Sequence, residues 1–166
     1  LDGPSINAIN LDGVDMETIE TKAQSVDYVI ACIGEGSYAE KPGDISDLNL
    51  PAGQIEFVEK LQSFGTPVIM VIVSGRPRLL NGAVSASNAI LNAYTPGPIG
   101  GQAVAETIVG LNIPSGRIPY TYPKYNANIP YPYHHTPSDM CGGNTTYTEC
   151  EVEWKFGSGL SYTSFE

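Results

Sequence analysis

The fold of this protein is decided by the stretch Val26-Asp-Tyr-Val-Ile-Ala-Cys-Ile-Gly-Glu-Gly-Ser-Tyr-Ala-Glu-Lys-Pro-Gly-Asp44. An apolar run from Val29 to Ile33, typical of a buried strand, gives way here to a loop that holds glycines, a proline and acidic residues. In an open α/β sheet, ligand-handling groups lie at the carboxyl ends of the strands. Glu35, which stands between two glycines at such a point, is therefore a candidate general acid. A solvated acidic loop after a core strand is the alternative interpretation.

Helical patterns and apolar runs alternate along the rest of the chain. The patterns predict helices at about 16–25, 51–64 and 100–109 and strands at about 26–33, 67–73 and 89–94. The run at 67–73 is apolar without alternation, which indicates a central strand covered on both faces. The segment 117–122 alternates and contains a proline, which suits a short edge strand. This order predicts a three-layer α/β/α sandwich with a mostly parallel sheet, built as a single domain over residues 1–166.

The second of these helices has clear boundary signals. Pro51 stands near its start and Gly65 follows its end, which is the usual asymmetry of helix termini. Phe57, Leu61 and Phe64 recur at helical spacing, so we expect them on the buried face of an amphipathic helix.

Composition restricts the classes of function. The chain has 166 residues, a hydrophobic fraction of 42% and a formal net charge of −10, so nucleic acid and anionic membranes are unfavourable partners. No apolar run approaches the roughly 18 residues that cross a bilayer. Neutral ligands such as sugars remain compatible with this charge.

Cysteines and a glycosylation signal indicate an oxidising compartment. Cys141 and Cys150 are close enough in sequence to close a surface loop with a disulfide, while Cys32 is expected to be a small buried hydrophobe inside its strand. Asn144 begins the chain's glycosylation sequon, Asn-Thr-Thr. We therefore expect a secreted protein.

The polar residues around Glu35 have less direct roles. Glu40 and Asp44 are expected to be solvated loop carboxylates, with Asp44 bonding to local amides. Arg76 follows the second apolar run, and we expect it to hold the Glu35 loop through an ion pair or a carbonyl contact rather than to bind substrate. For Tyr38, lining a cleft and anchoring the loop are equally compatible with the sequence.

No metal site and no cofactor are expected. The neighbouring residues His134 and His135 point in different directions in most backbones, and no third ligand stands at a typical spacing.

Four segments resemble, in order and spacing, the C-terminal domain of family 3 glycoside hydrolases, the β-glucosidase and exo-glucanase group. They are Gly34-Glu-Gly-Ser-Tyr-Ala-Glu-Lys-Pro-Gly-Asp44, Val73-Ser-Gly-Arg-Pro77, Pro114-Ser-Gly-Arg-Ile-Pro119 with Tyr122-Pro123, and Phe156-Gly-Ser-Gly-Leu-Ser-Tyr-Thr163. The resemblance implies a roughly six-stranded α/β/α sandwich that follows a (β/α)8 barrel. In that family the barrel supplies a nucleophilic aspartate, and the second domain supplies the acid/base glutamate, which the resemblance places at Glu35.

Two functions follow from this resemblance. The first is the acid/base-supplying domain of a retaining β-glucosidase-like enzyme that acts on β-linked glucosides or glucans, inactive without its barrel. The alternative is a non-catalytic secreted structural, surface or assembly protein derived from the same domain. A flavodoxin-like nucleotide binder has only the fold class in its favour and is opposed by the negative charge.

The carboxyl ends of neighbouring parallel strands meet at one edge of a sheet. The Glu35 loop and the turns 74–77 and 95–101 are therefore expected to lie together, exposing apolar side chains from Tyr38, Tyr94, Pro96 and Ile99. Exposed apolar patches of this kind usually mark interfaces. We expect the edge to be covered by a (β/α)8 barrel domain or subunit, or by self-association.

Overall fold

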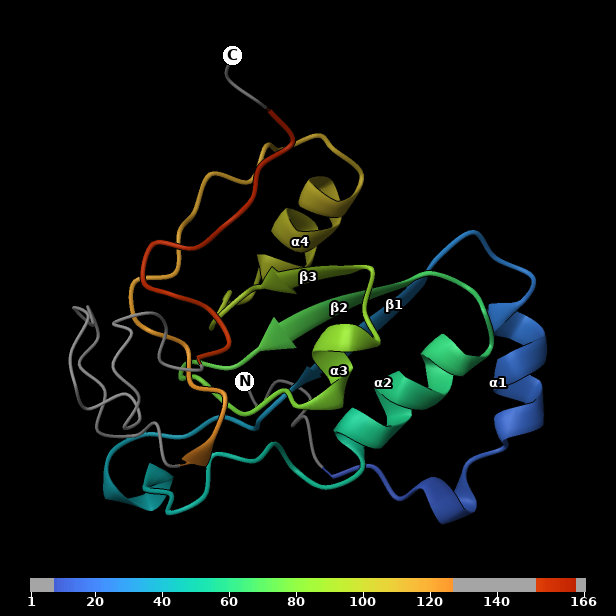
Figure 1. Cartoon of the computed structure of the whole chain (residues 1–166), viewed down its shortest axis with the longest axis horizontal. Coiled ribbons are helices and arrows are strands. Elements are labelled where there is room, and N and C mark those ends of the chain that lie inside the picture. Colours follow the sequence, from blue (N-terminus) through green and yellow to red (C-terminus); the bar gives the residue numbers. More distant parts are fainter. Residues whose placement is uncertain (1–7, 127–151, 164–166) are drawn as a thin grey trace, which may run out of the picture. The chain divides into compact units, whose positions relative to one another are not determined.

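The computed structural model describes residues 8–126 and 152–163. The chain divides into two compact units, residues 1–97 and residues 98–166. Figure 1 shows the elements of the first unit, which are η1 (Leu11–Gly13), α1 (Met16–Ala23), β1 (Val29–Gly34), η2 (Lys41–Gly43), α2 (Gln54–Ser63), β2 (Val68–Val73), α3 (Gly82–Ser85) and β3 (Ala89–Asn92). The second unit contains α4 (Gly100–Ile108).

The strands of the first unit form one parallel sheet in the order β1-β2-β3. The register pairs Val29 with Val68 at the start of β1 and Gly34 with Val73 at its end. The α/β class, the parallel sheet and the central position of β2 confirm the sequence prediction. Within the described residues the sheet has three strands, so a six-stranded sheet is not seen in this part of the chain.

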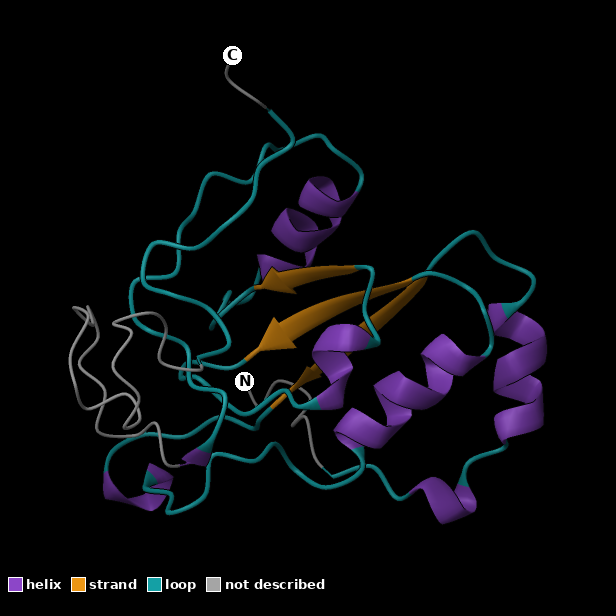
Figure 2. Ribbon diagram, viewed as in Figure 1, coloured by secondary structure: helices purple, strands orange, loops and turns teal. Residues whose placement is uncertain are grey.

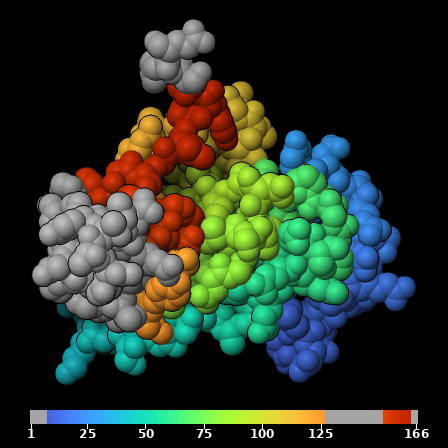
Figure 3. Space-filling model, viewed as in Figure 1, coloured from blue at the N-terminus to red at the C-terminus, as the bar shows by residue number. Residues whose placement is uncertain are grey.

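Helices α2 and α3 cover one face of this sheet (Figure 2). In the space-filling view their side chains form a continuous layer on that side (Figure 3). The buried positions of α2 are Gln54, Val58 and Leu61, while Phe57 is only half-buried. Leu61 and Phe64 are buried as expected, so the buried stripe differs from the expected one at Phe57 and includes the polar Gln54.

The opposite face of β1 is open in the described part of the chain. Ala31 and Ile33 are buried, whereas Ile30 is 52% exposed and the free thiol of Cys32 is also exposed. The expectation of a buried Cys32 is thus wrong. An apolar strand buries both faces only where a second layer covers it, and alternate side chains of β1 point to the uncovered side.

The second unit is mostly irregular around α4. The expected strand at 117–122 is reduced to one antiparallel bridge between Tyr122 and Trp154, whose rings meet edge-on with centroids 4.9 Å apart. Before Pro119, Ile118 also pairs with the C-terminal segment, since its N–H donates to Ser158 O at 2.9 Å and its carbonyl oxygen accepts from the Gly157 N–H at 2.8 Å. Tyr162 ties the end of the chain to α4 by donating its hydroxyl hydrogen to the Thr107 carbonyl oxygen at 2.9 Å.

Several sequence-based expectations concern residues outside the described ranges. The disulfide between Cys141 and Cys150, the glycosylation of Asn144 and the surface role of His134 and His135 all fall there and stay predictions. Among the residues that the structure describes, no helix is both long enough and apolar enough to cross a membrane.

Candidate functional site

The site begins where the ends of β1 and β2 come into close contact. A Cβ atom on Gly34 would lie 1.9 Å from the Val73 carbonyl oxygen, so only glycine allows this approach. The next residue, Glu35, continues the pairing by donating its backbone N–H to Val73 O at 3.2 Å. The Glu35 side chain therefore leaves the sheet at its carboxyl edge, beside the turn that follows β2.

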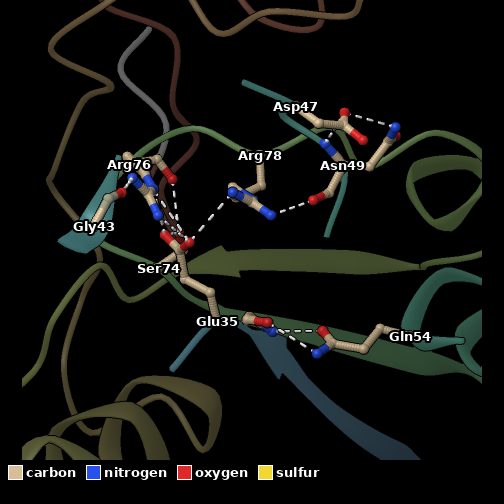
Figure 4. A network of polar contacts seen from close by, with 9 residues as sticks. Glu35, Gly43, Asp47, Asn49, Gln54, Ser74, Arg76 and Arg78 are labelled. Atoms are coloured by element: carbon tan, nitrogen blue, oxygen red, sulfur yellow. Dashed lines mark hydrogen bonds and ion pairs between the residues drawn. The ribbon is translucent and has the colours of Figure 1, made fainter. Parts of the chain in front are cut away.

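The Glu35 carboxylate is enclosed by donors (Figure 4). Its Oε1 accepts from Ser74 Oγ at 2.7 Å and from Arg76 Nε at 3.1 Å. Its Oε2 lies 3.0 Å from Arg76 Nη2 and 3.4 Å from Arg78 Nη1. Only 8% of this side chain is exposed. Both oxygens are thus committed to groups of the protein itself.

Arg76 joins this cluster to the loop that carries Glu35. Its Nη1 donates to the carbonyl oxygen of Gly43, the last residue of η2. Its guanidinium carbon lies 3.9 Å from the centroid of the Tyr38 ring, which is a cation–π contact. One guanidinium group therefore contacts the strand end, the loop and the 3-10 helix at once.

Tyr38 is packed between two glycines. A Cβ on Gly43 would lie 2.9 Å from Tyr38 Cδ2, and one on Gly75 would lie 2.8 Å from its hydroxyl oxygen. The residue as a whole is still 40% exposed. Of the two roles open for Tyr38, this packing favours anchoring the loop. The exposed part of the ring leaves room for contact with a ligand.

Arg78 is a site residue that the sequence analysis missed. Its side chain is 8% exposed, and its Nη2 donates to the carbonyl oxygen of Asn49. The Leu79 N–H donates to Leu48 O at 2.9 Å, so the segment after β2 is tied to the last part of the loop. The available signal was a second arginine directly before a pair of leucines, where a charged residue is forced into buried surroundings.

Gln54 was also missed, and it is fully buried. Its Oε1 accepts from the Gly34 N–H at 2.8 Å, and its Nε2 donates to the Gly34 carbonyl oxygen at 2.9 Å. The signal in the sequence was a polar residue in line with Val58 and Leu61 on the buried stripe of α2.

Two further carboxylates of this loop, Glu40 and Asp44, have different surroundings from Glu35. Glu40 and Asp44 are exposed and flank η2. In the described part of the chain, the Glu40 carboxylate has no hydrogen bond or ion pair. The Glu40 backbone has a φ of 54° and a ψ of −155°, a conformation that L-residues rarely adopt.

Within the first unit, the turns that were expected to lie together are in contact. A Cβ on Gly75 would lie 3.1 Å from Thr95 Cγ2, so the turns after β2 and β3 are in contact. Tyr94 is half-buried and Pro96 exposed, while Ile99 belongs to the second unit.

Among the described residues, no group of three or more His, Cys, Asp or Glu could hold a metal ion.

The model of the glycosyl hydrolase family 3 C-terminal domain matches residues 9–162. The "Lysosomal beta glucosidase" of Dictyostelium discoideum is 42% identical over 144 residues, which cover 86% of this chain and 17% of that protein. The "Periplasmic beta-glucosidase" of Salmonella typhimurium is 30% identical over 154 residues, covering 86% of this chain and 20% of that protein. This chain thus spans about a fifth of the length of these curated relatives.

Solved structures give the same result. A β-glucosidase from Erythrobacter marinus superposes with a TM-score of 0.75 at 30% identity, over 90% of this chain and 21% of that one. The fold also matches a β-glucosidase from Listeria innocua, with a TM-score of 0.82 at 24% identity, over 97% of this chain and 24% of that one. Since the family model covers nearly the whole chain, the chain belongs to glycosyl hydrolase family 3, as a C-terminal domain of that family.

Proposed function

We propose that this chain is the acid/base-supplying domain of a retaining β-glucosidase-type hydrolase that acts on β-linked glucosides or glucans. The observation that carries the proposal is the difference in exposure between two carboxylates of the loop between β1 and α2. One carboxylate of this loop is locked among protein donors, and another is presented to solvent. The similarity to β-glucosidases supports the substrate class.

The geometry favours Glu40 over Glu35 as the catalytic carboxyl group. A general acid must come within hydrogen-bond reach of the oxygen that it protonates. Glu35, which the family resemblance indicated, is 8% exposed, and both of its oxygens already accept from Ser74 and the two arginines. Glu40 is exposed and follows the anchored Tyr38. We therefore assign the acid/base role to Glu40, and to Glu35 the task of holding the loop.

Backbone strain at Glu40 supports the same assignment. A residue held in a sparsely populated conformation costs about 1–3 kcal/mol and persists only where its surroundings determine it. In the sequence, Glu40 lies between Tyr38, whose ring stacks on Arg76, and Gly43, whose carbonyl oxygen accepts from Arg76, so the backbone is held on both sides of it. Such strain is found preferentially at active sites.

The second carboxyl group must come from outside this domain. A retaining glycosidase needs a nucleophile about 5–5.5 Å from its acid/base group. We propose that a (β/α)8 barrel domain or subunit supplies it, because the part matched here makes up only 17% and 20% of the relatives' length. We further propose that the protein is secreted, on the support of the sequon and of relatives named as lysosomal and periplasmic.

The test uses the native gene product that contains this chain, with Glu40→Gln, Glu35→Gln and the exposed helix residue Glu56→Gln as a control. An acid catalyst matters most when the leaving group is poor. For Glu40→Gln we expect kcat/KM to fall about 10²–10⁴-fold on phenyl β-glucoside. On 2,4-dinitrophenyl β-glucoside, whose leaving group needs no proton, kcat/KM should change little. Azide should restore kcat, because this anion replaces water without needing a base.

Because Glu35 holds the loop that carries Glu40, Glu35→Gln is also expected to lower kcat/KM more on phenyl β-glucoside than on 2,4-dinitrophenyl β-glucoside, but by a smaller factor than Glu40→Gln and without rescue by azide. Glu56→Gln should match the wild type. Equal losses on both substrates in Glu40→Gln, without azide rescue, would argue against the assignment. If azide restored kcat in Glu35→Gln and not in Glu40→Gln, Glu35 would be the acid/base residue.

A further inference from the structure

We infer that Gln54 is a positioning residue for catalysis, because its side chain links the two ends of the loop that carries Glu40. We call this link the clasp, and the two joined ends, Gly34 and Gln54, the neck of the loop. This inference rests on the proposed function, since it concerns the placement of the proposed acid/base group. The loop leaves the sheet after Gly34 and rejoins regular structure at Gln54, the first residue of α2. These two residues are joined to each other by the Gln54 side chain.

The clasp has the pattern of a strand pairing. The Gln54 amide accepts from the Gly34 N–H and donates to the Gly34 carbonyl oxygen, at 2.8 and 2.9 Å. A residue of an adjacent strand would likewise accept from the N–H and donate to the carbonyl oxygen of the residue that it pairs with. Because a glutamine is fully buried here, both ends of its amide need partners. The orientation of the side chain is therefore determined by both bonds together.

The other side of the neck is also fixed. Gly53, with a φ of 81°, approaches the backbone so closely that a Cβ would lie 1.9 Å from the Ile9 carbonyl oxygen. The Ile9 N–H donates to Ala52 O at 2.8 Å. The start of α2 is thus held against the N-terminal segment on one side and against β1 on the other, so movement of Gln54 is restricted.

This arrangement makes the position of the loop depend on the clasp. Glu35 follows Gly34 directly, and its carboxylate holds Arg76, which in turn contacts Tyr38 and Gly43 around Glu40. A shift at Gly34 is therefore transmitted to the group that must meet the glycosidic oxygen. Misplacement of a catalytic group by about 1 Å can lower a rate by about a hundredfold.

A purely structural role for Gln54 predicts a different result from a positioning role. If the amide only fills space in the core, its replacement lowers thermal stability and affects all substrates equally. If it positions the acid, replacement affects substrates that need protonation more than those that do not. The leaving-group dependence of kcat/KM separates the two roles.

The experiment uses the native gene product with Gln54→Glu and Gln54→Met, each paired with the same change at Gln62. Glutamate has the shape of glutamine but cannot donate to the Gly34 carbonyl oxygen when ionised. Methionine keeps the length and removes both bonds. Gln62 lies in the same helix and is exposed, so Gln62→Glu and Gln62→Met control for charge and helix propensity.

For both Gln54 variants we expect kcat/KM on phenyl β-glucoside to fall about 10- to 100-fold, and on 2,4-dinitrophenyl β-glucoside by less than about threefold. The Gln62 variants should match the wild type on both substrates. Equal losses on the two substrates, or no loss, would overturn the inference. If Glu40→Gln itself shows no leaving-group dependence, the proposed function fails rather than the clasp.

A measurement on the wild-type protein covers the case in which the variants do not fold. The Gly34 N–H donates to the Gln54 side chain, so a persistent clasp should protect it from exchange as well as the β2 amides that pair with β1. Exchange of Gly34 at the rate of an exposed loop would show that the clasp opens freely and cannot position the loop.

Discussion

Glu35 and Glu40 lie on the same loop but have opposite surroundings. Two guanidinium groups and a hydroxyl surround the first, whereas the second is exposed. A buried carboxylate with such partners mainly holds its neighbours in place, because removing it leaves buried cations without a counter-charge. At the scale of single residues, the loop therefore has one enclosed carboxylate, Glu35, and one exposed carboxylate, Glu40, to which we assign the acid/base role.

Glu35→Gln should lower the free energy of unfolding by about 2–4 kcal/mol, because Arg76 and Arg78 lose their common counter-charge in a largely buried place. Glu40→Gln, at an exposed position, should change it by less than about 0.5 kcal/mol. Chemical denaturation of the native protein measures both values. Equal stability of the two variants would contradict the structural role of Glu35.

Gly43→Ala should displace Tyr38, since the new Cβ would lie 2.9 Å from Cδ2 of the ring. We expect kcat/KM to fall at least about tenfold, because Tyr38 and Gly43 both support the loop around Glu40. The matched control is Gly13→Ala, which is also the last residue of a 3-10 helix and has no atom within 4 Å of the new Cβ. If Gly43→Ala and Gly13→Ala have equal activity, the packing of Tyr38 does not matter for catalysis.

Helix α1 shows how a short element is stabilised at its start. The Asp15 side chain accepts from the Thr18 N–H at 3.1 Å and from the Thr18 hydroxyl at 2.6 Å. These hydrogen bonds, the hydroxyl first, lower the pKa of the Asp15 carboxyl from its ordinary value of 3.8. Since the helix has few apolar contacts beyond buried Ala23, the cap is a large part of what defines its beginning.

Because the pKa of Asp15 is lower in the folded than in the unfolded protein, its contribution to stability is complete above pH 3.8 and is lost as pH falls through the folded value. We expect Asp15→Ala to be less stable than the wild type at neutral pH, with a difference that shrinks in acid. Asp15→Asn, which can also cap, should show a smaller difference at neutral pH. Melting temperatures across this pH range test it, and a difference that is constant down to strong acid would contradict the cap.

At the scale of the whole molecule, the chain contains one half of the proposed catalytic machinery. It matches 17% and 20% of the length of two curated relatives, and in the proposed mechanism the nucleophile comes from a separate barrel. The open face of β1, with Tyr28 and Ile30 more than half exposed, is a further surface that the described residues leave uncovered.

The 166-residue chain by itself should not hydrolyse aryl β-glucosides, because the covalent step needs the second carboxylate. The assay is release of nitrophenol by the purified chain, compared with its Glu40→Gln variant. Turnover by the chain that disappears in Glu40→Gln would show that the domain holds a complete site and would overturn the two-part mechanism.

Alkylation of the native chain without reductant should label Cys32, which is exposed on the uncovered face of β1. The expected disulfide between Cys141 and Cys150 should protect both of these residues, and prior reduction should expose them to the reagent. Peptide mapping by mass spectrometry identifies the labelled sites. Label on Cys141 or Cys150 before reduction would contradict the disulfide.

The parts of this structure that could be predicted from the sequence are those that depend on short-range patterns. The apolar runs and the helical spacing predicted β1, β2, α2 and α4, because hydrophobic periodicity and terminal glycines act within a few residues. The same patterns put Glu35 at a strand end. They also failed where short-range signals were ambiguous, as at 117–122, which pairs with the C-terminal segment at Ile118 and Tyr122 without forming a continuous strand.

Which of these residues are buried together can be seen only in the tertiary structure. Gln54 and Gly34 are 20 residues apart, and Arg76 and Glu35 are 41 apart, so no local pattern could reveal that they pair. The exposure of Cys32 and the difference between Glu35 and Glu40 have the same origin. Burial depends on which elements cover a face, and that is a property of the packed sheet and helices rather than of any segment alone.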